Sequence, residues 1–480
     1  MQTGRSIRWA VAAGLAALAT TVAACSGSSG DKAGGEDKAG PRVLRLANAV
    51  DGPPPAQIES WAEEVSRLSR GTLAIQFKNR WRQGEPLFEA GTLEDVKAGK
   101  VEMAWVGSRV FDTVGVTSFQ ALVAPLLVDS YDLERTVFED GIPEQMLEGV
   151  SELDLVGIGV LPGPMRKVLG VSKPFVRPGD FEGQVVGLQD SAVADASLSA
   201  LGATPRSMPG GAELDGLDAY EQQLGAIWGN RYYKSAEYVG ANVNLWPRPL
   251  VIVMGKDAFE SLTPEHQAVL REAATAAMPE ALAAAQAEDD EAVLQLCRRG
   301  LTFEVASEGE LAGLRTALEP VYAELTADPA TKSYIDAITN LKTELAASAE
   351  APACTSTEPP ATASPIPDGT YETTVTEADY EKAGVSEEPG AFPGVFRMIF
   401  DAGELTIVGP IRDGEVIDEG EVGGLTFFRD QIEVYFADDF KILARWSLED
   451  GSLRFTDCCG GNRKGALNVI WESHPWVKID

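Results

Sequence analysis

One stretch of the chain gathers side chains that suit the binding of a small polar molecule. Between residues 221 and 248 aromatic rings stand among amides and charges, and the candidate ligand-binding residues there are Glu221, Trp228, Asn230, Asn242, Trp246 and Arg248. Aromatic faces beside amides suit sugars, polyols and amphipathic acids, because the rings cover apolar parts of such ligands while the amides bond to their polar groups. The stretch therefore predicts non-covalent binding, although the two tryptophans fit core packing equally well.

A second set of candidates follows strands that we expect in the first third of the chain. Glu85 and Trp105, with Arg109 nearby, fall in loops after those strands. In open α/β sheets the strand ends line the crevice that receives the ligand. We therefore add Glu85 and Trp105 to the candidate ligand-binding residues, with Trp105 equally suited to the core.

The sequence contains few residues or motifs that are typical of an enzyme active site. His266 and His474 are the only histidines, and neither a Gly-x-Ser-x-Gly motif nor a phosphate-cradling glycine loop occurs. Histidine-based triads and metal sites are therefore almost excluded, and the cysteines do not have the spacing of a zinc site. We expect a protein that is not an enzyme and that uses no cofactor or metal.

Length and charge narrow the class further. The chain has 480 residues, which is too long for one core, and its formal net charge is -33. This charge argues against nucleic-acid binding, because nothing offsets the phosphate repulsion. About three structural units are expected for a chain of this length.

Residues 1–25 have the features of a bacterial lipoprotein signal. Arg5 and Arg8 precede an apolar, alanine-rich stretch that ends just before Cys25. That stretch is too short and too weakly apolar for a permanent membrane span. We expect cleavage before Cys25 and lipidation of its thiol, with residues 26–41 as a flexible tether, so that the protein is anchored on the outer face of the cytoplasmic membrane. An ordinary secretory signal is the alternative.

Residues 42–348 alternate between short apolar runs and amphipathic segments. Helices are expected over 53–69, 92–97, 192–201 and 267–295, and two more over 308–345. Strands are expected at 43–47, 73–77, the end of 98–105, 155–160, 185–188, 226–228, 250–254 and 301–303. This alternation predicts an α/β fold with parallel-type sheets and helices on both faces.

The pattern changes after a proline-rich linker at 349–367. Over 368–480 short strands dominate, at 371–375, 396–400, 404–408, 425–428, 431–436, 443–446, 452–455 and 469–471. Turn sequences rich in Asp and Gly separate them. Strands of this number and spacing predict an antiparallel β-barrel or sandwich, and the pattern weakly resembles a small lipocalin-like domain.

Four cysteines remain once Cys25 is assigned to the lipid. An exported protein can form disulfides, and four thiols allow three pairings. We favour the pairing of Cys297 with Cys354, which joins the start of the linker to the main body. The adjacent Cys458 and Cys459 could form a strained vicinal bond, which would be unusual, and their pairing stays open.

Several motifs in register resemble one known family, the DctP-like solute-binding proteins of TRAP transporters. They are WAEEV at 61–65, SRGTL at 69–73, DVKAGKVEMA at 95–104, LGATP at 201–205, GLDAYE at 216–221 and FESLTPE at 259–265. The resemblance implies a two-lobed periplasmic-binding-protein-like fold with a hinge and a long helix. It also implies that the protein captures a small polar solute, organic acids among the candidates, and delivers it to a TRAP-type membrane permease.

One position departs from the family pattern. The strand at 185–188 usually ends in an arginine that grips a ligand carboxylate, and here Gly187 stands in its place. The resemblance implies that Arg166 is a second ligand-contacting arginine and that Gln189, just beyond Gly187, faces the cleft, while Arg248 is a candidate replacement for the lost charge. The solute is then either neutral or held by another cation. A receptor subunit that feeds a membrane signalling partner and an ABC-type binding protein remain the alternatives.

Overall fold

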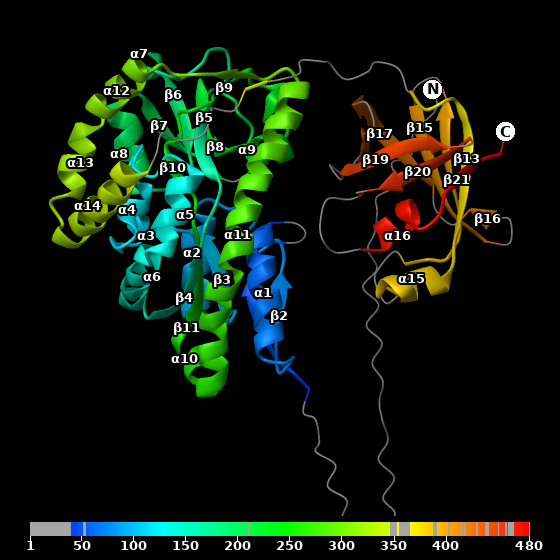
Figure 1. Cartoon of the computed structure of the whole chain (residues 1–480), viewed down its shortest axis with the longest axis horizontal. Coiled ribbons are helices and arrows are strands. Elements are labelled where there is room, and N and C mark those ends of the chain that lie inside the picture. Colours follow the sequence, from blue (N-terminus) through cyan, green and yellow to red (C-terminus); the bar gives the residue numbers. More distant parts are fainter. Residues whose placement is uncertain are drawn as a thin grey trace, which may run out of the picture. The chain divides into compact units, whose positions relative to one another are not determined.

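The computed structural model describes residues 40–479, except for 51–53, 210, 346–352, 355–364 and short segments between 387 and 464 (Figure 1). Cys25, Cys459 and most of the linker lie outside the described residues. The predicted lipidation of Cys25 and the pairing of Cys459 therefore stay predictions. Across the described residues, no helix has the length and apolar character needed to cross a membrane.

The first lobe is built on a five-stranded mixed sheet in the order β2-β1-β3-β11-β4. Its strands are β1 (Arg42–Ala47), β2 (Leu73–Lys78), β3 (Met103–Gly107), β4 (Leu155–Leu161) and β11 (Leu250–Gly255). β1 runs parallel to β2 and β3, whereas β11 is antiparallel to β3 and β4. Four of the five strands thus run in the same direction, and β11 runs against them because it enters this sheet on a return from the second lobe.

The helices of the first lobe form where apolar residues recur every three or four positions. In α1 (Ala56–Leu68) the buried Ile58, Trp61 and Val65 share one face. Helix α2 (Phe88–Lys97) begins at Phe88 rather than near residue 92, after Leu87 in a left-handed conformation. The other short helices between the strands are α3 (Val110–Thr113), α4 (Gln120–Val123), α5 (Tyr131–Glu139), α6 (Ile142–Met146), η1 (Leu147–Leu153) and α10 (Lys256–Glu260).

The second lobe contains a sheet in the order β12-β9-β5-β8-β6-β7, with β10 paired to β5. Its strands are β5 (Met165–Gly170), β6 (Val185–Leu188), β7 (Thr204–Ser207), β8 (Ala219–Gln223), β9 (Tyr238–Gly240), β10 (Trp246–Pro247) and β12 (Thr302–Glu304). Its helices include α7 (Pro178–Phe181), α8 (Ala192–Ala200), η2 (Tyr232–Lys234), α12 (Glu308–Ala317), α13 (Glu319–Leu325) and α14 (Pro329–Glu344). The segment 308–345 thus holds three helices instead of two, because Pro320 and Pro329 each stand at the start of a new helix.

Residues 226–228 were expected as a strand, and the structure corrects this. They belong to helix α9 (Leu224–Gly229), and the strand is the preceding β8. Leu224 and Ile227 are both buried, with the three-residue spacing of a helix face. A side chain at Gly225 would collide with Glu288 of α11, so this glycine permits α9 to lie close to the long helix.

Two chain crossings and one long helix connect the lobes. The chain passes from β4 to β5 through Gly163 and returns from β10 to β11 through Arg248. A Cβ on Gly163 would overlap the Arg248 carbonyl, so glycine is required where these crossings touch. Helix α11 (Pro264–Arg298), capped by the Thr263 hydroxyl, packs on α1 and β4 of the first lobe and on α9 of the second (Figure 1).

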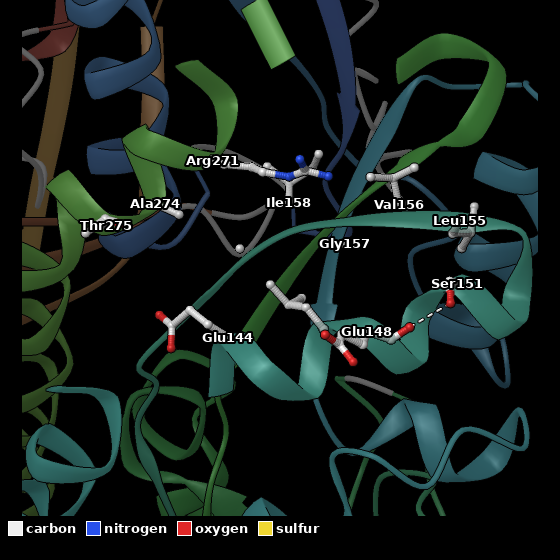
Figure 2. Close-up of a pocket in the computed structure, with 12 residues that line it drawn as sticks. Glu144, Glu148, Ser151, Leu155, Val156, Gly157, Ile158, Arg271, Ala274 and Thr275 are labelled. Atoms are coloured by element: carbon white, nitrogen blue, oxygen red, sulfur yellow. Dashed lines mark hydrogen bonds between the residues drawn. The ribbon is translucent and has the colours of Figure 1, made fainter. Parts of the chain in front are cut away.

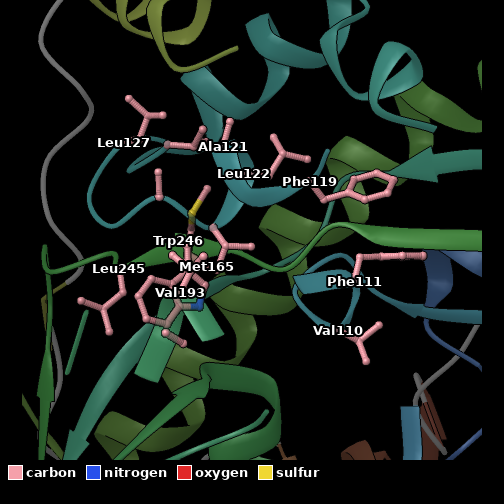
Figure 3. Close-up of a cluster of buried hydrophobic side chains, with 14 of the residues drawn as sticks. Val110, Phe111, Phe119, Ala121, Leu122, Leu127, Met165, Val193, Leu245 and Trp246 are labelled. Atoms are coloured by element: carbon pink, nitrogen blue, oxygen red, sulfur yellow. The ribbon is translucent and has the colours of Figure 1, made fainter. Parts of the chain in front are cut away.

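One continuous hydrophobic cluster lies where the lobes meet. Phe111 and Phe119 pack with their ring centroids 4.7 Å apart. Figure 3 shows them near Leu122, Val193 and Trp246, side chains that come from different elements of the chain. The two lobes therefore share a packed core where the chain crosses between them.

The C-terminal domain is a single antiparallel sheet in the order β14-β13-β21-β20-β19-β18-β17-β15-β16. An additional pairing of β14 with β15 turns this meander back on itself, as the barrel expectation requires. The strands are β13 (Gly369–Val375), β14 (Gly394–Asp401), β15 (Glu404–Arg412), β16 (Glu415–Val416), β17 (Glu419–Phe428), β18 (Gln431–Phe436), β19 (Lys441–Glu449), β20 (Ser452–Thr456) and β21 (Trp476–Lys478). Helix α15 (Glu377–Ala383) joins β13 to β14.

The last expected strand of this domain, residues 469–471, is instead part of helix α16 (Ala466–Glu472). Trp471 from this helix packs edge-on against Phe455 of β20, with ring centroids 4.8 Å apart. Three consecutive buried side chains gave the segment the appearance of a strand, but they fill the core from a short helix.

A disulfide joins Cys297, near the end of α11, to Cys354 in the linker. This is the pairing that the sequence favoured. It attaches the linker to the second lobe at the point where α11 ends.

Candidate functional site

The second lobe contributes a buried ion pair on adjacent strands. Arg166 on β5 has no exposed surface, and its guanidinium donates to both carboxylate oxygens of Glu221 on β8, with Nη2 2.7 Å from Oε2. Nη2 also donates to the Glu221 carbonyl at 2.9 Å, and Nη1 lies 3.4 Å from Oε1 of Gln189. Burial alone would lower the pKa of Arg166, but the Glu221 carboxylate raises it above its ordinary value.

The first lobe contributes a second buried group centred on Glu89 of α2. Its Oε1 accepts from the Gly107 backbone at 2.8 Å and from Nη2 of Arg248 at 3.0 Å, and its Oε2 accepts from Nη2 of Arg109. Burial would raise the pKa of Glu89, but Arg109 and Arg248 lower it below its usual range. Burial also lowers the pKa of Arg248 to about 10, so this guanidinium stays charged at neutral pH.

Trp105 orients one of these cations. The Arg248 guanidinium lies over the Trp105 ring, 5.3 Å from its centroid. The indole Nε1 donates to Oδ1 of the buried Asn48 at 3.2 Å. Trp105 is therefore both part of the first-lobe core and a support for the charged cluster.

The two groups face each other across the lobes. A small pocket is lined by Leu87, Phe88, Glu89, Ala90 and Val110 of the first lobe and by Gln189, Asp190 and Met208 of the second. Arg166 contributes to the lowered pKa of Glu89, which also indicates that the two groups are close. We call the set formed by Glu89, Arg109, Arg166, Glu221 and Arg248 the interlobe charge cluster.

Asp112 of α3 lies at the edge of this cluster and has partners of its own. Its carboxylate accepts from the Ser191 hydroxyl at 2.7 Å and from the backbone of Ala192 and Val193 at 2.9 and 3.0 Å. These donors form the start of α8, where the helix dipole favours a negative charge. Burial nonetheless raises the pKa of Asp112. Asp112 thus links the two lobes through hydrogen bonds to the start of α8, and it also attracts Arg109.

Arg109 holds the spare donors of the interlobe charge cluster. It is 3% exposed, and within the described part of the chain its Nε and Nη1 have no hydrogen-bond partner. A buried guanidinium with unused N–H groups is costly unless something bonds to it. The arrangement can therefore bind an anion or another acceptor between the lobes.

Gly187 does not open a larger cleft. A Cβ at this position would lie 2.7 Å from Leu217 and 2.9 Å from Tyr220, with Met208 at 3.2 Å. Apolar side chains thus occupy the space beside the strand where the family pattern has an arginine. The positive charge comes instead from Arg109 and Arg248, on the first lobe and the crossing.

The structure places the other candidates from the aromatic stretch outside the interlobe charge cluster. Asn230 is exposed and bonds to the Ala226 carbonyl at the end of α9, because that helix turn needs a cap. Asn242 exchanges two hydrogen bonds with the Ala306 backbone, at 2.8 Å each. Both amides are therefore used by the local backbone.

Three further candidates also take structural positions. Trp246 is buried in the hydrophobic cluster of Figure 3, and Trp228 is half-buried on α9. The Glu85 side chain is 54% exposed and pairs with Arg82. Helix α2 starts earlier than expected, so Glu89 rather than Glu85 points inward. Of the ten predicted ligand-binding residues, the cluster thus includes Arg166, Glu221 and Arg248, the pocket lining includes Gln189, and Trp105 packs against Arg248.

Sequence reasoning missed Glu89 and Asn48. A signal for Glu89 was present: it stands three, four and seven positions before Thr92, Leu93 and Val96, all buried on α2. An acid on the apolar face of a helix is rarely buried without a cation, so it marks a paired site. Asn48 had no such signal, because it follows β1 in a loop.

A larger pocket of about 690 Å³ lies elsewhere on the first lobe. Figure 2 shows β4 between Arg271 of α11 on one side and Glu144 and Glu148 on the other. Its lining includes no member of the interlobe charge cluster. Among the described residues no group of histidine, cysteine or acidic side chains is arranged to hold a metal ion.

Comparison with known proteins places the chain in a family. The model for DctP, "bacterial extracellular solute-binding protein, family 7", matches residues 51–328. The C4-dicarboxylate-binding periplasmic protein DctP of Rhodobacter capsulatus is 20% identical over 301 residues, which cover 59% of this chain and 86% of that protein. The 2,3-diketo-L-gulonate-binding protein YiaO of Escherichia coli K12 is 23% identical over 184 residues, 37% of this chain and 55% of that protein.

Solved structures share the fold of the two lobes. A TRAP periplasmic solute-binding protein from Xanthobacter autotrophicus Py2 with bound β-D-galacturonate superposes with a TM-score of 0.56 at 22% identity, over 62% of this chain and 99% of that one. The sugar acid binding protein DctPAm of Advenella mimigardefordensis, in complex with galactonate, gives a TM-score of 0.56 at 20% identity, over 63% and 99%. The chain described here belongs to the DctP family of bacterial extracellular solute-binding proteins, which are not enzymes.

Proposed function

We propose that this protein is the solute receptor of a TRAP-type transporter and that it binds a small organic acid at the interlobe charge cluster. The unused N–H groups of Arg109, buried between the lobes, carry this proposal. An anion that accepts from them would relieve the cost of an unsatisfied buried cation. Closure of the lobes would then be favoured by the bound solute.

The known ligands of relatives support an acid as the solute. The proteins named above are described as binding C4 dicarboxylates, 2,3-diketo-L-gulonate, galacturonate or galactonate, all of which carry carboxylates. The absence of an arginine at position 187 does not remove the positive charge, since Arg109 and Arg248 both belong to the interlobe charge cluster. A neutral solute would leave that charge without a partner.

Binding is tested by the thermal stability of the chain from Pro41 onward, refolded to remove any bound solute, against organic acids, neutral sugars, polyols and amino acids. A solute at 100 times its dissociation constant adds about 2.7 kcal/mol of stability. We expect stabilisation by acids and none by the matching neutral sugars. Stabilisation by neutral sugars alone would refute the acid as solute.

Delivery to a permease and lipid anchoring complete the proposal. Residues 1–25 support an N-terminal lipid on Cys25, which would hold the receptor at the membrane that contains the permease. Mass spectrometry of the N-terminal peptide would detect the acyl chains. Uptake of the identified acid into vesicles that contain the permease should depend on this protein, whereas a signalling receptor would give no uptake.

A further inference from the structure

Glu89 already acts as an anion bound inside the interlobe charge cluster. Each of its carboxylate oxygens accepts from a different arginine, Oε1 from Arg248 and Oε2 from Arg109. The Gly107 backbone N–H adds a third donor. Its side chain is 8% exposed, so the carboxylate stands where water cannot replace these bonds.

The missing side chain of Gly107 makes this arrangement possible. A Cβ there would lie 2.5 Å from Nη1 of Arg109 and 3.3 Å from both Nε of Arg248 and Oε1 of Glu89. All three charged groups therefore pack against bare backbone. Any other residue at 107 would push at least one guanidinium away from the carboxylate.

The hydrogen-bond donors of the cluster leave room for one further carboxylate. Three guanidinium groups face the carboxylates of Glu89 and Glu221, and of the three only Arg109 has buried N–H groups without a partner among the described residues. Asp112 also attracts Arg109, but its carboxylate oxygens accept from Ser191 and from the start of α8 and leave those N–H groups unused. Buried charges are tolerated only when they are paired.

We infer that Glu89 is an internal counter-anion that restricts the solute to a single carboxylate. A single carboxylate can bond to the free donors of Arg109. A dianion with the same carbon skeleton would bring a second carboxylate. The arginines that could pair with it, Arg109 and Arg248, are already paired with Glu89. This inference rests on the proposed binding of an organic acid and names the class: monoanionic acids in preference to diacids.

The test compares galactonate with galactarate, which share a six-carbon hydroxylated chain and differ by one carboxylate. Isothermal titration calorimetry at pH 7.5 gives both dissociation constants for the wild-type protein and for Glu89→Gln. Glutamine retains the size and can still accept from Gly107, but it carries no charge. Glu94→Gln, on the exposed face of the same helix, is the matched control.

We expect wild type to prefer the monoacid by about tenfold or more, the scale of one charged hydrogen bond. Glu89→Gln should shift the ratio toward the diacid by at least about tenfold, and Glu94→Gln should leave it unchanged. Equal shifts in the two variants, or no shift in either, would overturn the role of Glu89. If Glu89→Gln fails to fold, the wild-type protein alone decides, and a wild-type preference for the diacid would overturn the role of Glu89. A wild-type protein that binds no organic acid of either charge would refute the proposed function itself.

Discussion

At the scale of single residues, Arg166 is poorly suited to bind a solute, because its guanidinium N–H groups already have partners within the protein. Both edges of its guanidinium meet Glu221 or Gln189, and neither Arg166 nor Glu221 is exposed. Its removal would leave a carboxylate buried without a partner, which is far costlier than the pair itself. Arg166 is therefore expected to hold the second-lobe sheet and to shape the cleft.

Arg166→Met should lower the free energy of unfolding by about 3–5 kcal/mol, because Glu221 loses its counter-charge. Urea denaturation of the solute-free protein measures this. The double variant Arg166→Met with Glu221→Gln should recover much of the loss, since no buried charge remains. Arg454→Met, which breaks an exposed ion pair with Glu449, serves as control and should change stability by less than about 1 kcal/mol. An unaltered stability in Arg166→Met would contradict the structural role.

Gly107→Ala should weaken binding of an acid while leaving the fold intact. The φ of Gly107 is outside the left-handed region, so alanine fits the backbone, and the nearest obstacle is the flexible end of Arg109. We expect a loss of affinity of about tenfold, the scale of one charged hydrogen bond, and a stability change below about 1 kcal/mol. Calorimetric titration and urea denaturation measure the two effects.

The control for this variant is Gly179→Ala, where a Cβ meets nothing within 4 Å. It should bind the acid as the wild type does. Full affinity in Gly107→Ala would mean that the position of the Arg109 guanidinium does not matter for binding.

At the scale of elements, periodicity predicted most helices and strands but not which side chains reach the cleft. The buried face of α1 could be predicted from Ile58, Trp61 and Val65 alone. The start of α2 could not, because Leu87 adopts a left-handed conformation that sequence pattern does not signal. That start decides that Glu89 faces the arginines and Glu85 faces solvent. The strands predicted at 226–228 and 469–471 were wrong for a related reason, because short apolar runs fit a strand or one helix face equally well.

Helix α5 brings a buried polar network to the crossing between the lobes. Glu134 accepts from the Gly163 backbone at 3.0 Å, and Tyr131 accepts from Met165 and donates to Asp289 of α11 at 2.6 Å. Burial raises the pKa of Glu134 to about 8 and that of Asp289 to about 7. The folded protein therefore keeps protons that the unfolded chain releases above about pH 4.5.

This network predicts that the protein becomes less stable as pH rises from about 5 to 8. Glu134→Gln stays neutral at every pH and can still accept from Gly163, so its unfolding free energy should depend less on pH. The difference in slope should approach about 1.4 kcal/mol per pH unit. Urea denaturation between pH 5 and 8.5 measures it, and Asp289 contributes to the slope that remains below pH 7, together with other acids whose pKa burial raises.

Glu139→Gln, on the exposed side of the same helix, should keep the wild-type slope. A slope in Glu134→Gln equal to that of the control would show that Glu134 is ionised in the folded protein at neutral pH.

At the scale of the whole molecule, the family motifs and the change of pattern at 349–367 predicted the two kinds of domain. Motifs spread over some hundreds of residues carry more information than any single site, because each fixes one element in the order of a known fold. The C-terminal hydrophobic cluster, with Tyr371, Phe455 and Trp476, draws on buried residues from Ile366 onward. Contacts such as Glu89 with Arg248 join residues far apart in sequence, and no local pattern encodes them.

The disulfide between Cys297 and Cys354 should contribute strongly to stability, because it closes a loop with a sequence separation of 57 residues. In the chain-entropy model a loop of this length is worth about 4 kcal/mol, through restriction of the unfolded chain. The variant Cys297→Ser with Cys354→Ser should therefore unfold at lower urea than wild type under non-reducing conditions. Solute affinity should be unchanged, since neither cysteine lines the interlobe pocket. Added reductant should destabilise the wild type far more than this variant. In the variant, any effect of reductant can come only from the remaining cysteines. A loss below about 1 kcal/mol in the variant would mean that the linker is held near α11 without the bond, or is already restricted in the unfolded chain.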